Sequence, residues 1–195
     1  MKKYNLIQSF INEHLDAINK IDSKIHKNLD DIIQLLVKTF NKNSKVFFCG
    51  NGGSAADAQH LTAEFLIRLR PNVNRSPLPA IALSSLDSST FTAMINDYDP
   101  SDIFLRPFQA LANKNDVLVV ISTSGNSKNI LNLVKFAKKN NFKIIGLLGK
   151  NGGLISRYCN YKLIVNSKTT ARIQELHIMF GHIIAEIVER KIFNK

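Results

Sequence analysis

A histidine and a glutamate four positions apart are the first residues whose types and spacing could do chemistry. His60 and Glu64 close the stretch FFCGNGGSAADAQHLTAEF, which covers residues 47–65. In a helix this spacing places both side chains on one face, one turn apart. A histidine and a carboxylate so placed can share a metal ion or act as a base and its neighbour. An exposed pair can equally be a surface contact, but the glycine-rich loop just before it favours a functional interpretation.

Two loops rich in Gly, Ser and Thr follow apolar segments with the pattern of buried strands. They are GNGGSAAD, residues 50–57, and STSGNSKN, residues 122–129. Small residues let a ligand approach the backbone, and the helix after each loop offers free N–H groups and a positive dipole end to an anion. Ser54 and Ser127 are placed to act as N-caps or as ligand donors. For either loop alone, ordinary turn chemistry is the alternative.

The second loop has the donors to hold one phosphate group. Its four hydroxyl residues surround a single glycine: Ser122, Thr123, Ser124 and Ser127. It lacks the lysine and the Mg²⁺ ligands that phosphoryl transfer requires. We therefore expect the phosphate to be a handle for binding and not the reacting group.

The first loop also fits a dinucleotide fingerprint, G-x-G-x-x-A, at Gly50, Gly52 and Ala55. That fingerprint requires an acidic residue about 20 positions further on, to bind the ribose. The nearest candidate, Asp87, lies well beyond that distance. The dinucleotide interpretation is therefore disfavoured.

The last apolar-periodic segment, residues 171–193, adds Gln174 and His182. His182 stands among apolar residues, so a buried core histidine is the alternative to a functional one. The two residues are eight positions apart, roughly 12 Å along an ideal helix. One regular helix could not easily bring both to one metal ion. Either Gln174 bends inward from the first turn, or the two residues reach a site from different subunits.

These residues need elements to position them, and apolar periodicity indicates which. Residues 4–40 predict one long helix, with two helices broken near 19–23 as the alternative. Beyond it, strands alternate with helices, which predicts an α/β three-layer sandwich with a mostly parallel sheet. The strands are expected at 45–50, 78–84, 116–122, 143–149 and 161–166, and the helices at 54–70, 88–97, 127–140 and 171–193. Ligands of such sheets bind at the carboxyl ends of the strands, where both loops would lie.

Length and charge bound the remaining possibilities. The 195 residues suit one domain, with 1–42 as a helical oligomerisation segment and 43–195 as the α/β core. The net charge is +11, but the basic residues are scattered, so neither nucleic acid nor membrane is an expected partner. No apolar run approaches the ~20 residues of a membrane span. Cys49 and Cys159 suggest neither a disulfide framework nor a metal motif, which favours the cytoplasm.

The combination of GNGGSAADAQHLTAEF, STSGNSKNI and TARIQELHIMFGH resembles the sugar isomerase (SIS) domain family and, within it, the phosphoheptose isomerases. The resemblance covers nearly the whole chain and implies a flavodoxin-like fold and a homotetramer with sites between subunits. It implies conversion of sedoheptulose 7-phosphate to D-glycero-D-manno-heptose 7-phosphate through an enediol, the first step towards heptose units of bacterial surface polysaccharide.

The resemblance also implies roles for individual residues. Glu64 would be the catalytic base and His182 its acid partner, and Zn²⁺ would be held by His60, Glu64, Gln174 and His182. The implied substrate-binding residues are Asn51, Gly52, Gly53, Glu64, Asn96, Asp97, Ser122, Thr123, Ser124, Ser127 and Gln174, with Ser54 and Arg68 near the phosphate.

Two points remain open in the sequence. A non-catalytic SIS protein could sense a sugar phosphate or bind a partner such as a replication initiator on the same scaffold. A protein that only binds would have no chemical need for all four proposed metal ligands, which favours the enzyme. The segment 65–84, FLIRLRPNVNRSPLPAIALS, is more basic and apolar than the resemblance leads us to expect.

Overall fold

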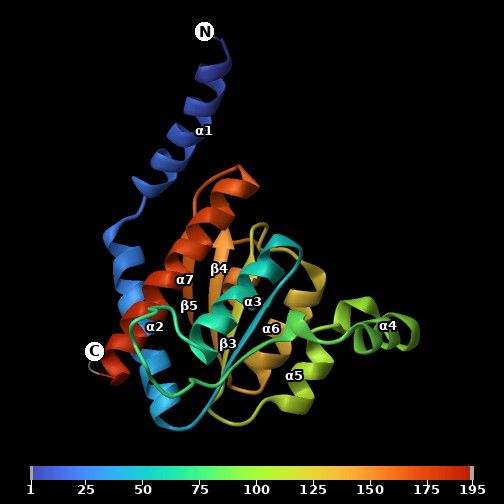
Figure 1. The fold of residues 1–195 in the computed structure, drawn as a ribbon. Coiled ribbons are helices and arrows are strands. Elements are labelled where there is room, and N and C mark those ends of the chain that lie inside the picture. Colours follow the sequence, from blue (N-terminus) through green and yellow to red (C-terminus); the bar gives the residue numbers. More distant parts are fainter. Residues whose placement is uncertain (1, 194–195) are drawn as a thin grey trace.

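The computed structural model describes residues 2–193 as a sheet between two layers of helices, with a helical extension at the N-terminus (Figure 1). The helices are α1 (Lys2–Ile18), α2 (Ser23–Asn41), α3 (Gly53–Leu66), α4 (Ser88–Asp97), α5 (Leu105–Leu111), α6 (Lys128–Lys139) and α7 (Thr170–Phe193). The strands are β1 (Val46–Gly50), β2 (Ala80–Ala82), β3 (Val117–Ser122), β4 (Lys143–Gly149) and β5 (Tyr161–Val165). Short 3₁₀ turns lie at Leu83–Ser85, Pro100–Asp102 and Ile155–Arg157.

The five strands form an all-parallel sheet in the order β2-β1-β3-β4-β5. Both faces are covered, so β1 and β3 are buried along their whole length. Successive side chains point to opposite faces: Val46 and Phe48 pack with α2, α3 and α7, whereas Phe47 and Cys49 pack with α5 and α6. The predicted three-layer α/β sandwich is confirmed.

The strand order reverses between β1 and β3. The chain passes from β1 outward to β2, then returns to β3 and continues in the other direction to β5. In open α/β sheets, the crevice at such a reversal is where ligands bind. The two glycine- and serine-rich loops follow β1 and β3, so both lie at this switch point.

The single helix predicted over residues 4–40 was wrong, and its alternative of two helices broken near residues 19–23 is confirmed, because the chain breaks between Ile18 and Ser23. Asp22 is extended, and its carboxylate accepts a hydrogen bond of 2.9 Å from the backbone N–H of Ile25, which caps α2. The apolar spacing of three and four continues across the break, so periodicity alone did not reveal it. The consequence is that α2 packs on the sheet while α1 projects beyond it (Figure 1).

Other differences are local. The third helix ends at Leu66 and not near Pro71, and β2 is reduced to three residues before a 3₁₀ turn. Helix α5 was not predicted from the sequence; its Pro107 lies in the first turn, where a proline is tolerated because the N–H groups have no helical partner. Within residues 2–193, no helix combines the length and apolarity needed to cross a membrane.

Candidate active site

Hydrogen bonds join the two switch-point loops. The carboxamides of Asn51, in the first loop, and Asn129, in the first turn of α6, bond reciprocally at 3.0 and 2.9 Å. In the second loop, the Ser122 hydroxyl accepts a 3.1 Å bond from the N–H of Gly125 and lies 3.4 Å from the Ser127 hydroxyl. The predicted loop residues therefore do come together. Asn129 was overlooked, although it belongs to the quoted STSGNSKN segment.

The helices after both loops begin without a side-chain cap. Gly52, with φ of 57°, is the N-cap of α3, so the predicted capping role of Ser54 is wrong: Ser54 is buried in the first turn. Ser127 is the N-cap of α6, as expected, but its hydroxyl makes no capping bond. Neither N-cap residue bonds the first turn through its side chain, although in α6 the N–H of Ile130 donates to Asn129 Oδ1 at 2.9 Å. The other N–H groups at these helix ends favour an anion.

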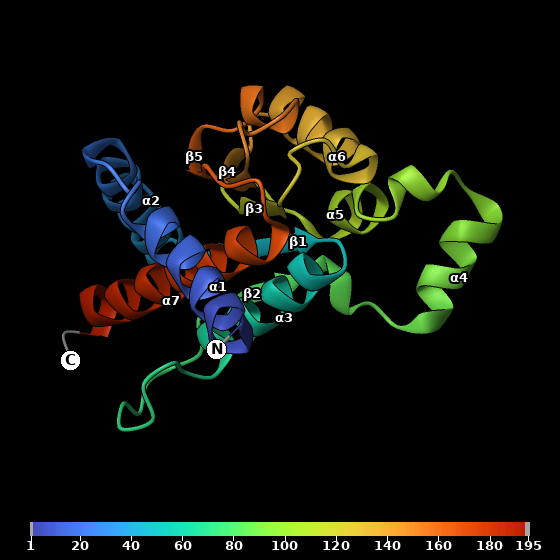
Figure 2. The same cartoon turned by 90° about the horizontal axis from the view of Figure 1, so that it is seen from above.

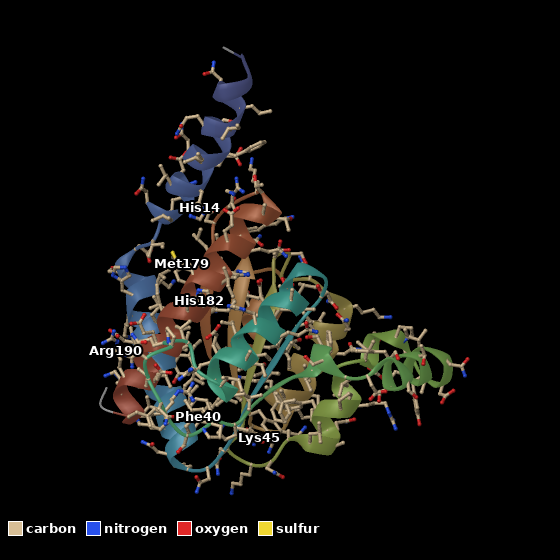
Figure 3. The ribbon with its side chains drawn as sticks, in the orientation of Figure 1. His14, Phe40, Lys45, Met179, His182 and Arg190 are labelled. Carbon is tan, nitrogen blue, oxygen red and sulfur yellow. The ribbon has the colours of Figure 1, made fainter. Side chains whose placement is uncertain are left out.

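The histidine and glutamate pair of α3 meets His182 of α7. The Nε2 atoms of His60 and His182 are 2.8 Å apart, and His60 Nε2 lies 3.3 Å from Glu64 Oε1. One ligand atom from each of the three residues lies within 4.8 Å of the others. The His60 side chain is half exposed, whereas Glu64 is largely shielded. His182 projects from the middle of α7 (Figure 3) and is not a core histidine.

Close packing of α3 against α7 makes this meeting possible (Figure 1). Gly181, next to His182, has no side chain, and a Cβ there would approach Leu61 to 2.4 Å. Any larger residue would push the two helices apart. Because Leu61 follows His60, the glycine sets the helix separation at the level of the cluster.

Gln174 lies elsewhere on α7. Its carboxamide packs against Gly53 in the first loop, where a Cβ on Gly53 would come within 2.2 Å of its nitrogen. Gln174 therefore stands beside the phosphate-type loops and not beside His182, in line with the ~12 Å that eight helical residues span. Of the four predicted metal ligands, three come together within one chain.

Three other predicted residues are not brought to the loops. Asn96 and Asp97 end α4, which stands away from the sheet in both views (Figures 1 and 2), and their side chains bond to each other at 2.7 Å. Arg68 is exposed just beyond the end of α3. Within this single chain they take no part in the cluster of His60, Glu64 and His182.

Comparison with known proteins shows the family of this chain. Residues 9–149 match the SIS domain. A phosphoheptose isomerase of Clostridium acetobutylicum is 43% identical over 193 residues, which cover 98% of this chain and 97% of the relative. This chain belongs to the phosphoheptose isomerase family. A relative of the same name from Campylobacter concisus is 46% identical over 188 residues, covering 94% and 97%. The structure of a phosphoheptose isomerase from Francisella tularensis superposes with a TM-score of 0.90 at 35% identity, covering 97% and 100%.

In this member of the phosphoheptose isomerase family, the cluster of His60, Glu64 and His182 has the donors for a metal ion. Two imidazole nitrogens and a carboxylate oxygen are ligands that suit Zn²⁺, and three protein ligands leave a position open for substrate. His60 is half exposed, so the site is accessible from solvent. The donor set therefore fits a metal ion such as zinc.

Asp57 is a further carboxyl group near the site. It lies one turn before His60 on α3, and its Oδ2 atom is buried without a hydrogen-bond partner among the described residues. Burial raises the pKa of its carboxyl, and the nearby His60 partly offsets this rise. The position three residues before His60 was the only sequence signal for it.

Proposed function

We propose that the protein converts sedoheptulose 7-phosphate to D-glycero-D-manno-heptose 7-phosphate in the cytoplasm, at the start of heptose biosynthesis for bacterial surface polysaccharide. The observation that carries the proposal is the cluster of His60, Glu64 and His182, the first two of which lie on a helix that begins at the first of the two phosphate-type loops, in a chain of the phosphoheptose isomerase family. Both cysteines are buried and unpaired, as suits a reducing compartment.

The second loop holds the substrate's phosphate. Ser122, Thr123, Ser124 and Ser127 offer hydroxyl and backbone donors at the N-terminus of α6, and Asn51 faces them from the first loop. Gln174 lies against that first loop, which supports a role in binding the sugar phosphate. Anchoring the phosphate orients the distant carbonyl end of the sugar, and such positioning lowers the barrier of the chemical step.

Proton transfer at C1 and C2 is the chemistry of the cluster. Glu64 removes a proton from C1 of the ketose, and the electron pair forms the C1–C2 double bond of the enediol as His182 protonates the oxygen on C2. Return of a proton to C2 and loss of the proton on O1 give the aldose. Zinc bound by His60, Glu64 and His182 would supply a positive charge that polarises the sugar carbonyl.

A homotetramer is part of the proposal, because α1 exposes an apolar stripe. Its large apolar residues are 47–59% exposed: Leu6, Ile7, Phe10, Ile11 and Leu15. Contiguous apolar surface of this kind marks a contact with another protein. Helix α4 also projects from the core, so in the assembly Asn96 and Asp97 would complete the site of a neighbouring subunit.

An assay with purified protein tests the proposal. We expect turnover of sedoheptulose 7-phosphate that a chelator abolishes and Zn²⁺ restores, and in D₂O we expect deuterium at C2 of the product. Complete transfer of the C1 hydrogen of the ketose to C2, with no deuterium in the product, would indicate a hydride shift and contradict the enediol. Binding of the sugar phosphate without turnover by metal-loaded protein would favour a non-catalytic sensor instead.

A further inference from the structure

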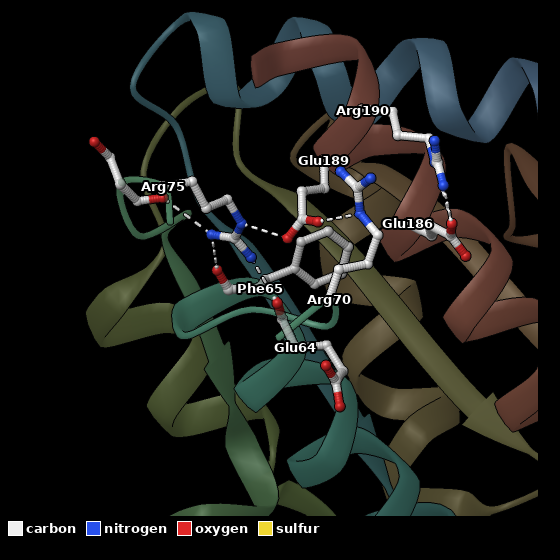
Figure 4. A network of polar contacts seen from close by, with 8 residues as sticks. Glu64, Phe65, Arg70, Arg75, Glu186, Glu189 and Arg190 are labelled. Carbon is white, nitrogen blue, oxygen red and sulfur yellow. Dashed lines mark hydrogen bonds and ion pairs between the residues drawn. The ribbon is translucent and has the colours of Figure 1, made fainter. Parts of the chain in front are cut away.

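The basic segment that follows α3 turns back onto the site helices. Arg70 and Arg75 both reach Glu189 of α7, with Nε–Oε1 and Nε–Oε2 distances of 2.8 and 2.6 Å (Figure 4). The side chains of Arg75 and Glu189 are each only 1% exposed. Two of the arginines that make segment 65–84 unusually basic therefore both bond to one buried carboxylate.

Arg75 also bonds the end of the helix that carries Glu64. Its Nη2 donates to the backbone carbonyl of Glu64 at 2.7 Å, and its Nη1 donates to that of Phe65 at 2.9 Å (Figure 4). Both carbonyls belong to the last turn of α3, where backbone oxygens have no partner within the helix. A positive charge is favourable there, because the C-terminal end of a helix is the negative end of its dipole.

The same guanidinium thereby connects the two helices of the site. Glu189 lies seven residues after His182, which is two turns along the same face of α7. Burial opposes ionisation of Glu189, but hydrogen bonds from Arg75 and Arg70 outweigh it and hold the pKa of the carboxyl below its usual range. The charged form of the Glu189 carboxyl is therefore favoured beside the two arginines.

We propose that Arg75 and Glu189 form a clamp that holds the Glu64 turn of α3 at a fixed position relative to His182 on α7. Arg75 is a positioning residue and does not touch substrate. Together with the contact between Gly181 and Leu61, the clamp fixes the separation of α3 and α7 on both sides of Glu64. The inference rests on the proposed isomerase function, because it assigns a purpose to the placement of Glu64.

A role in stability alone is the competing explanation. A buried ion pair often adds little net stability, because desolvation of both charges offsets their attraction. The fork of Arg75 reaches Glu189, Glu64 and Phe65 from three different nitrogens, which one lysine ammonium cannot do. Arg75→Lys therefore keeps a positive charge beside Glu189 but cannot donate hydrogen bonds to the carbonyls of Glu64 and Phe65 at the same time.

The test compares Arg75→Lys and Arg75→Met with Arg190→Met. Arg190 pairs with Glu186 on the same helix, but at the surface, which makes it the matched control. Each variant is assayed for melting temperature, for kcat and KM on sedoheptulose 7-phosphate, and for affinity for Co²⁺ by visible absorption. Co²⁺ alone is the probe of the cluster geometry.

We expect Arg75→Lys to remain folded at the assay temperature while Co²⁺ affinity and kcat each fall about 10- to 100-fold, as for other residues that orient metal ligands. KM should change less than about threefold, because the phosphate loop is not touched. In Arg75→Met, Co²⁺ affinity and kcat should fall at least as far. If that variant does not fold, the result for Arg75→Lys tests the clamp. Wild-type Co²⁺ affinity and kcat in folded Arg75→Lys would overturn the clamp. If the unmodified protein shows no turnover, the proposed isomerase function is wrong. The Co²⁺ affinities of the variants would still test the clamp in that case.

Discussion

The Nε2 atoms of His60 and His182 lie 2.8 Å apart, although the residues are 122 positions apart in the sequence. Their rings meet edge to face, with centroids 5.0 Å apart and planes at 65°. This distance fits one hydrogen bond between the two rings, in which the tautomers decide which nitrogen donates. The contact links α3 and α7 within one chain, and it places an imidazole ring of each helix beside Glu64.

Removal of either proton-transfer group should stop the reaction. Glu64→Gln and His182→Gln keep the size of their side chains but cannot exchange protons in the same way. We expect kcat to fall by at least about 10²-fold in each variant, the usual contribution of general acid–base catalysis. Turnover of sedoheptulose 7-phosphate, with circular dichroism to monitor folding, measures the effect.

Two matched substitutions serve as controls for those variants. Glu186→Gln changes a partly exposed glutamate of α7, and His26→Gln changes an exposed histidine of α2. Both should retain wild-type kcat. Full activity in Glu64→Gln or in His182→Gln would rule out the role assigned to that residue.

The contact between Gly53 and Gln174 predicts an effect on substrate binding. In Gly53→Ala the new Cβ would lie 2.2 Å from the Gln174 nitrogen, so the carboxamide must move. The flexible side chain can yield, and the protein should still fold. Loss of one hydrogen bond to a charged ligand costs at least about 1.5 kcal/mol, so KM should rise about tenfold. Steady-state kinetics measure this change.

Ala56→Ser, on the exposed side of the same helical turn, is the control for Gly53→Ala and should leave KM unchanged. The double variant Gly53→Ala/Gln174→Ala removes both the clash and the Gln174 carboxamide. If the KM of the double variant equals that of the wild type, Gln174 does not bind substrate. The higher KM of Gly53→Ala would then come from distortion of the loop by the clash.

The sequence was informative where local chemistry decides structure. The parallel strands and the two loops at their carboxyl ends were predicted because short apolar runs end in glycine or serine. The eight-residue spacing of Gln174 and His182 also indicated that one helix would not bring both to one metal.

The remainder depends on contacts that no local pattern encodes. Arg75 and Glu189 are 114 positions apart, so their pairing could not be read from a basic segment. The break before α2 is different, because the Asp22 cap is a local contact and a break near residues 19–23 was the alternative that the sequence offered. Whether Asn96 and Asp97 reach substrate depends on a neighbouring subunit, which the sequence of one chain does not place.

The exposed stripe on α1 predicts that charge will disrupt the assembly. Leu6→Glu combined with Phe10→Glu places two carboxylates on side chains that are 59% and 49% exposed. Burying them against another subunit would be costly unless they were paired. We expect a smaller species by light scattering after size exclusion, with the α/β core still folded.

Asn12→Glu, which adds charge at an exposed position of α1 outside the apolar stripe, is the control and should leave the mass unchanged. If Asn96 and Asp97 complete a neighbour's site, the disrupted species should also be inactive. A wild-type mass for Leu6→Glu/Phe10→Glu would remove α1 from the interface.

Buried His177 should make the protein less stable as the pH falls below neutral. Its side chain lies on α7 with no exposed surface, and neither ring nitrogen has a hydrogen-bond partner of good geometry among the described residues. Burial lowers the pKa of His177 to about 4, against a small opposing effect of the Leu148 backbone. The unfolded chain, whose histidine titrates near 6.5, therefore binds more protons than the folded chain between these two pH values.

The free energy of unfolding should therefore fall by about 1.4 kcal/mol per pH unit in this window, or about 3 kcal/mol by pH 4. Urea titrations of the wild type and His177→Leu at several pH values isolate the effect, because the carboxylates contribute equally to both proteins. Leucine cannot take up a proton, so the variant should gain stability relative to the wild type as the pH falls from about 6.5 to about 4. A difference between the two proteins that stays constant over this range would mean that His177 is protonated in the folded state.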